Sequence, residues 1–99
     1  MVKFGRSQKF TKENIFKVSE DSALVYKIKG SAGENLYTGI AGRGRGVDRL
    51  LEHKEVEKEK IPGGTRFQTA SVKNKDVAER IEKIIIRKEN PEFNIQKKK

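Results

Sequence analysis

The sequence predicts an α+β fold, in which a small three-stranded antiparallel sheet is flanked by helices. Three segments alternate apolar and polar residues with the two-residue period of a strand, at residues 23–29, 35–41 and 66–72. Two other segments space their apolar residues as amphipathic helices do, from Val47 to about Lys60 and from Asp76 to Lys88. The predicted order is therefore strand, strand, helix, strand, helix.

The N-terminal region, residues 1–22, is predicted to form a basic arm followed by a short strand. Phe4 and Phe10 are the large apolar residues that we expect to anchor the arm, and residues 14–18 supply the strand. A turn over residues 30–33, bounded by two glycines, then joins the first two main strands into a hairpin.

Both predicted helices carry signals at their ends. The first follows a Gly-Arg loop at residues 42–46 and is ended by Pro62 and the two glycines after it. The second is predicted to begin with a capping box of Asp76 and Glu79. It ends at Asn90-Pro91, because the residue before a proline is pushed out of the helical region. Its buried stripe is expected to consist of Val77, Ile81, Ile84 and Ile85.

Length and composition restrict the class of protein. A chain of 99 residues makes one domain, with residues 23–95 as its main module and residues 96–99 as a basic tail. Lys and Arg number 23 against 14 Asp and Glu, and the net charge of +9 favours nucleic acid as the partner. The alternative is a basic soluble protein of the kind found in hot environments. No apolar run is long enough to span a membrane and no signal peptide is present, so a cytoplasmic location is expected.

The residue types exclude several kinds of chemistry. The chain has no cysteine and a single histidine, His53. Disulfides, thiolate metal sites, cysteine nucleophiles and paired histidine ligands are therefore excluded. Any reaction has to use tyrosine, arginine, lysine, carboxylates and one imidazole.

The Gly-Arg loop is a candidate contact for nucleic acid. Its glycine spacing matches neither the P-loop nor the dinucleotide-binding motif. Arg43 and Arg45 are expected to contact backbone phosphates, and the alternative is an exposed linker.

The two helices offer further candidates. Arg49 and His53 are four residues apart, on a side of the first helix that is predicted to lie nearly opposite the core. There they could grip one phosphate, or they are an ordinary surface pair. Glu82 lies at the edge of the buried stripe of the second helix. It is a candidate single ligand for Mg²⁺, which would keep water and phosphate oxygens as its other ligands; the alternative is a surface or ion-paired carboxylate.

The order of these residues resembles the catalytic module of the GIY-YIG endonuclease family, over residues 23–95. Val25-Tyr26 and Tyr37-Thr38-Gly39 are separated by ten residues, as the family's two strand motifs are. Arg49 and His53 follow on the next helix. Glu82 precedes Asn94 by 12 residues, and Asn94 ends a Pro-x-aromatic step.

Three departures from the family pattern accompany the resemblance. Leu24 stands where the first motif has glycine, and Thr38 stands where the second has isoleucine. The loop before Arg49 is also about two residues longer than expected and is rich in glycine and arginine. A leucine lacks the backbone freedom of a glycine, so the fine geometry of the hairpin is expected to differ.

The resemblance implies a metal-dependent endonuclease that hydrolyses phosphodiester bonds of DNA. Glu82 would bind one Mg²⁺ or Mn²⁺, and Arg49 would stabilise charge on the phosphate. Tyr26, with Tyr37 and His53 nearby, would orient or deprotonate the attacking water. Asn94 would support the site.

Two alternatives to an endonuclease stay open at this stage. One is a non-catalytic basic module that binds DNA or RNA, and the other is a structural protein of a larger basic assembly. Because the module fills nearly the whole chain, a nuclease of this size is expected to prefer DNA shape or damage over a long sequence. A homodimer or a protein partner would have to supply further specificity.

Overall fold

A four-stranded antiparallel sheet in the order β1-β4-β2-β3 forms the centre of the computed structural model, which describes residues 3–97. The three predicted strands are confirmed as β2 (Ala23–Lys29), β3 (Asn35–Ala41) and β4 (Arg66–Val72). A two-residue strand that was not predicted, β1 (Gln8–Lys9), pairs with β4 and leaves β3 as the opposite edge.

The N-terminal arm is bound to the sheet more closely than expected. Besides the β1 pairing, the Gly5 amide donates to the Thr69 carbonyl across 2.9 Å. Phe10 is buried, and its ring centroid lies 5.8 Å from that of Phe67. The two predicted anchors are therefore confirmed, since Phe4 is also partly buried.

The short strand predicted at residues 14–18 is wrong, because the chain forms the helix α1 (Lys12–Phe16) there. Thr11 caps this helix by accepting a hydrogen bond from the Asn14 amide at 3.2 Å. Ile15 alone is buried in it, whereas Phe16 is exposed. A local cap and one buried contact decide the conformation of this segment.

The two predicted helices are confirmed, with changes at their ends. α2 (Gly46–Glu55) stops at the extended residue Val56, and a 3₁₀ turn (Glu57–Glu59) replaces the rest of the predicted helix. α3 (Lys75–Glu89) is capped by Asn74, whose side chain accepts from the Val77 amide at 3.0 Å. The capping box predicted at Asp76 is therefore wrong.

The C-terminal end of α3 leads directly into another helix. Asn90, in the left-handed region at φ 47°, ends α3, and Pro91 precedes α4 (Glu92–Lys97). Residues 98–99 of the predicted basic tail lie outside the described residues.

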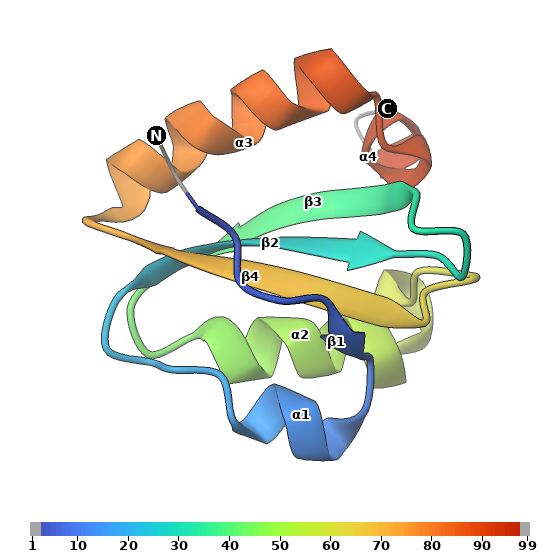
Figure 1. Ribbon diagram of the computed structural model, residues 1–99, viewed down its shortest axis with the longest axis horizontal. Coiled ribbons are helices and arrows are strands. Elements are labelled where there is room, and N and C mark those ends of the chain that lie inside the picture. The colour runs from blue at the N-terminus through green and yellow to red at the C-terminus, as the bar shows by residue number, and fades with distance from the viewer. Residues whose placement is uncertain (1–2, 98–99) are drawn as a thin grey trace.

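The sheet separates two apolar clusters (Figure 1). α1 and α2 cover one face, while α3 and α4 lie over the other. The larger cluster includes Tyr26, Leu50 and Phe67, and the smaller includes Val25, Ala78 and Ile85. Ile84 is 63% exposed, so its predicted place in the buried stripe of α3 is wrong. Within the described residues, no helix is both long and apolar enough to cross a membrane.

Candidate active site

Four of the side chains singled out by the sequence meet between the sheet and α2. Tyr26 comes from β2, Tyr37 from β3, and Arg49 and His53 from successive turns of α2. The ring centroid of Tyr37 lies 4.7 Å from that of His53 and 6.4 Å from that of Tyr26. The Arg49 guanidinium is close enough to lower the pKa of both tyrosines.

Tyr26 and His53 form a buried hydrogen bond. The Tyr26 Oη and His53 Nε2 atoms are 2.8 Å apart, and neither residue has more than 1% of its surface exposed. On the other side of the ring, His53 Nδ1 lies 2.9 Å from the carbonyl oxygen of Glu59. A carbonyl oxygen only accepts, so we assign the proton of the neutral ring to Nδ1, and the Tyr26 hydroxyl donates to Nε2.

The prediction that His53 lies beside Arg49 on a side nearly opposite the core is wrong. At 100° per residue, His53 is only about 60° from Leu50 around the helix axis. Both are fully buried, whereas the side chain of Arg49 is 33% exposed. Arg49 is therefore the member of the pair that a phosphate can reach. Its Nη1 atom donates to Glu52 Oε1 at 2.6 Å.

Gly39 makes room for the Tyr26 hydroxyl. The two residues face each other in the β2–β3 register. A Cβ atom at position 39 would lie 2.5 Å from Tyr26 Oη, closer than real Cβ contacts allow. The glycine of the Tyr37-Thr38-Gly39 motif is thus required by the tyrosine of the neighbouring strand.

Burial keeps both tyrosines neutral. It raises the pKa of Tyr26 well above its usual value, and the neighbouring Tyr37 raises it further, while Arg49 lowers it. Burial also raises the pKa of Tyr37, which Arg49 lowers and Glu82 raises. Neither hydroxyl can therefore act as a base near neutral pH without a group that takes its proton.

Glu82, in the middle of α3, is half-buried and lies within electrostatic range of both tyrosines. Across residues 3–97, no three His, Cys, Asp or Glu side chains gather where they could hold a metal ion. A cation at this place would thus depend on one carboxylate from the protein and on oxygen atoms from water and substrate, a set that suits Mg²⁺.

Asn94 is buried and binds the backbone of β3. Its Oδ1 atom accepts from the Thr38 amide at 2.7 Å, and its Nδ2 atom donates to the Thr38 carbonyl at 2.8 Å. These two bonds hold the peptide groups between Tyr37 and Gly39. Asn94 therefore lies where it can position the second motif without touching a substrate.

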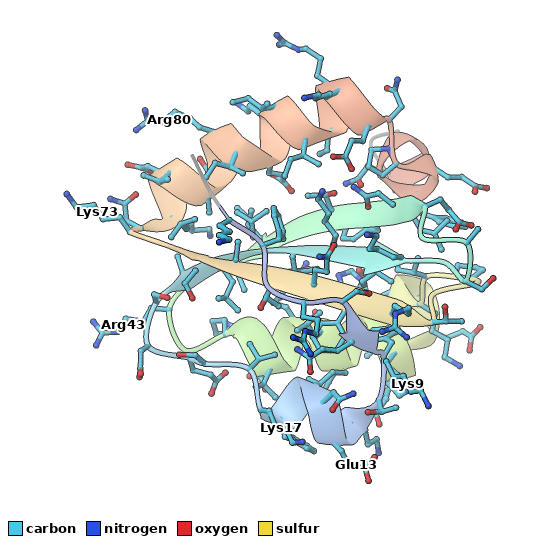
Figure 2. All side chains as sticks on the ribbon, in the orientation of Figure 1. Lys9, Glu13, Lys17, Arg43, Lys73 and Arg80 are labelled. Atoms are coloured by element: carbon cyan, nitrogen blue, oxygen red, sulfur yellow. The ribbon has the colours of Figure 1, made fainter. Side chains whose placement is uncertain are left out.

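The two loop arginines are exposed. Arg43 points outward from the loop before α2 (Figure 2), and Arg45 is the N-cap residue of that helix. Neither belongs to the buried group of Tyr26 and His53. Their predicted contact with phosphates stays a prediction.

Leu24 replaces the first motif's glycine, and Gly46 is the glycine that accommodates it. The Leu24 side chain is 1% exposed, and its Cδ1 atom would lie 2.5 Å from a Cβ atom at position 46. Sequence reasoning missed this pair, as it missed the Glu59 carbonyl that fixes the His53 ring. Gly46 was assigned to the Gly-Arg loop, where a glycine is expected, so its place at the start of α2 gave no signal. The Glu59 carbonyl gives no signal either, because every residue carries a backbone carbonyl.

Comparisons with known proteins agree with this geometry. No family model and no curated protein matches the chain. Two solved structures do, both of the GIY-YIG N-terminal endonuclease domain of UvrC from Thermotoga maritima. One is bound to its catalytic divalent cation magnesium, and the other is a point mutant bound to its catalytic divalent cation. Each has a TM-score of 0.67 and 27% identity, and the match covers 84% of this chain and 97% or 98% of the solved domain. The α+β fold and the ordered site residues thus make this chain a GIY-YIG-like module.

Proposed function

We propose that this chain is an endonuclease that hydrolyses phosphodiester bonds of DNA with the help of a divalent cation. The observation that carries the proposal is the 2.8 Å bond between Tyr26 and His53, made beside Arg49. The similar solved domains are endonuclease domains with a catalytic cation, which supports the same reaction class. The net charge of +9 suits a polyanionic substrate.

Glu82 is the residue that would hold the cation, for which Mg²⁺ is the first choice and Mn²⁺ the second. When bound, such a cation neutralises charge on the phosphate and stabilises the leaving oxygen. Arg49, with its partly exposed guanidinium, would bind a phosphate oxygen and stabilise the charge that develops there.

Tyr37 and Tyr26 would have different tasks. Tyr37 is partly exposed, so its hydroxyl can orient the attacking water. Tyr26 is fully buried and already donates to His53. The Tyr26 hydroxyl would accept a proton from the attacking water as its own proton passes to His53 Nε2. The Glu59 carbonyl would stabilise the resulting imidazolium. In this transfer His53 is the group that takes the proton of the neutral Tyr26 hydroxyl.

Replacement of Glu82 by glutamine tests the proposal. Glu82→Gln keeps the size of the side chain and removes the charge that would hold the cation. We expect nicking of supercoiled plasmid to fall by several orders of magnitude, because metal stabilisation contributes several kcal/mol and each ~1.4 kcal/mol is tenfold in rate. DNA binding without metal should be retained.

Asp76→Asn is the matched control, since Asp76 is an exposed carboxylate in the first turn of the same helix. It should nick at close to the wild-type rate. A folded Glu82→Gln protein with full activity would overturn the metal assignment. Binding without nicking by the wild-type protein would instead favour the non-catalytic DNA- or RNA-binding module, which the exposed arginines of the loop also support.

A further inference from the structure

A groove of about 390 Å³ lies beside the candidate active site. It is lined by the end of β3 and Gly42, by Arg45 and Arg49 at and near the start of α2, and by Lys75 and Glu79 of α3. Arg49 therefore belongs both to this groove and to the candidate active site. The groove leads away from Arg49 towards the beginnings of α2 and α3.

The groove is electropositive. Its lining contains three cationic side chains and one carboxylate, so its net charge is +2. α2 and α3 lie on opposite faces of the sheet and both begin at the same end of it (Figure 1), so their helix dipoles add partial positive charge there. Arg43 and Lys73 point outward at that end as well (Figure 2).

Two of the three cations have no partner among residues 3–97. In the described part of the chain, the side chains of Arg45 and Lys75 make neither an ion pair nor a hydrogen bond, and both are exposed. Arg49, by contrast, is paired with Glu52. Because Glu79 offsets only one of the three positive charges that line the groove, an anionic ligand would be attracted there.

We propose that Arg45 and Lys75 bind a backbone phosphate of the DNA strand that is cut, near the scissile phosphate on Arg49. The inference rests on the proposed function, because Arg49 fixes where the strand enters the groove. The charged side chains suit a phosphate, and no aromatic ring lines the groove to stack on a base. The contact positions the strand and carries no sequence preference.

The first test measures binding to a short duplex in EDTA, where no cleavage occurs. In the double variant Arg45→Gln/Lys75→Gln, affinity should fall equally for unrelated sequences. The slope of log K against log salt should shrink by about 0.9 for the one phosphate contact that is lost. Glu79→Gln should bind more tightly than the wild type, because it removes the negative charge of the groove.

The matched control is Arg80→Gln/Lys83→Gln, which removes the same charge from exposed positions of α3 outside the groove. It should leave the slope nearly unchanged. Circular dichroism checks that both variants fold, as expected for exposed side chains. An equal loss of slope in both double variants would overturn the groove as a specific site.

The second test locates the phosphate. Duplexes in which single phosphates are replaced by neutral methylphosphonates are scanned along the cut strand. One position should weaken binding of the wild type and of the control, but not of Arg45→Gln/Lys75→Gln, which has already lost that contact. The same loss in all three proteins would overturn the inference.

The two proposals fail in different ways. Groove-dependent binding by a wild-type protein that does not nick plasmid with Mg²⁺ overturns the endonuclease and leaves a phosphate site. Nicking by a protein whose salt slope does not depend on Arg45 and Lys75 overturns the groove and leaves the endonuclease.

Discussion

At the scale of single residues, the site depends on small spaces and on one backbone oxygen. Gly39 leaves the room that the Tyr26 hydroxyl fills, and the Glu59 carbonyl determines which nitrogen of His53 can accept a proton. Neither feature is itself a reactive group. Both decide whether the reactive groups have the required geometry.

Gly39→Ala should destabilise the fold and disrupt the Tyr26–His53 bond. The added Cβ would lie 2.5 Å from Tyr26 Oη, and relief of such overpacking typically costs about 1–3 kcal/mol. Urea unfolding measures the loss. Gly42→Ala is the control, because a Cβ there meets no atom within 4 Å. Equal stability of the two variants would contradict the close approach.

His53→Phe should change the pH dependence of cleavage. Because its pKa is raised, Tyr26 stays protonated near neutral pH and must pass its proton to a neutral imidazole. Wild-type cleavage should therefore decrease as the pH falls and a histidine becomes protonated. The variant should lose this acid limb and keep a low rate that changes little between about pH 5.5 and 8.5, as single-turnover nicking can show. An unchanged acid limb would assign it to another group.

At the scale of elements, the sequence predicted what periodicity controls. The alternation of apolar residues gave the bounds of β2, β3 and β4, because each is long enough to show its period. α1 and β1 are five and two residues long, too short to show a period, and they are decided by the Thr11 cap and by pairing with β4. Their assignments were wrong or missed for that reason.

The same distinction applies to the candidate site. The motif order identified Tyr26, Tyr37 and Arg49, which the structure brings together. The outward-facing position predicted for His53 was wrong, because the buried side of α2 is wide enough to include both Leu50 and His53. The acceptor at Glu59 could not be predicted, since every residue carries the same carbonyl group.

Asn94→Ala should loosen the connection between α4 and β3. The variant removes both side-chain bonds to Thr38 and leaves a buried amide and carbonyl unpaired, at a cost of about 1–3 kcal/mol for each group. Hydrogen exchange should show lost protection at the Thr38 amide. Cleavage should fall while metal-free DNA binding changes little. Full Thr38 protection in the variant would mean that other contacts hold β3.

At the scale of the whole molecule, size limits how much DNA the chain can cover. Its longest principal extent is 30 Å, and duplex DNA rises 3.4 Å per base pair, so the chain spans about nine base pairs. Short coverage by a basic surface favours recognition of DNA shape or damage over a long sequence.

Footprinting of the isolated chain should therefore show protection of no more than about nine base pairs, with similar affinity for unrelated undamaged sequences. Sedimentation in the same buffer controls for self-association. A long sequence-specific footprint from a monomer would contradict this expectation. The same footprint from a dimer would identify the second copy as the source of specificity.

Leu24 and Gly46 have an evolutionary consequence. Because the leucine side chain occupies the space above the helix glycine, the two positions are epistatic: the fitness of a residue at one depends on the residue at the other. Replacement of Leu24 by the glycine of the GIY-YIG motif would leave an unfilled space, whereas a larger residue at position 46 would first have to displace the leucine. Each change alone is therefore expected to destabilise the fold, and a change at one position is expected to require a change at the other.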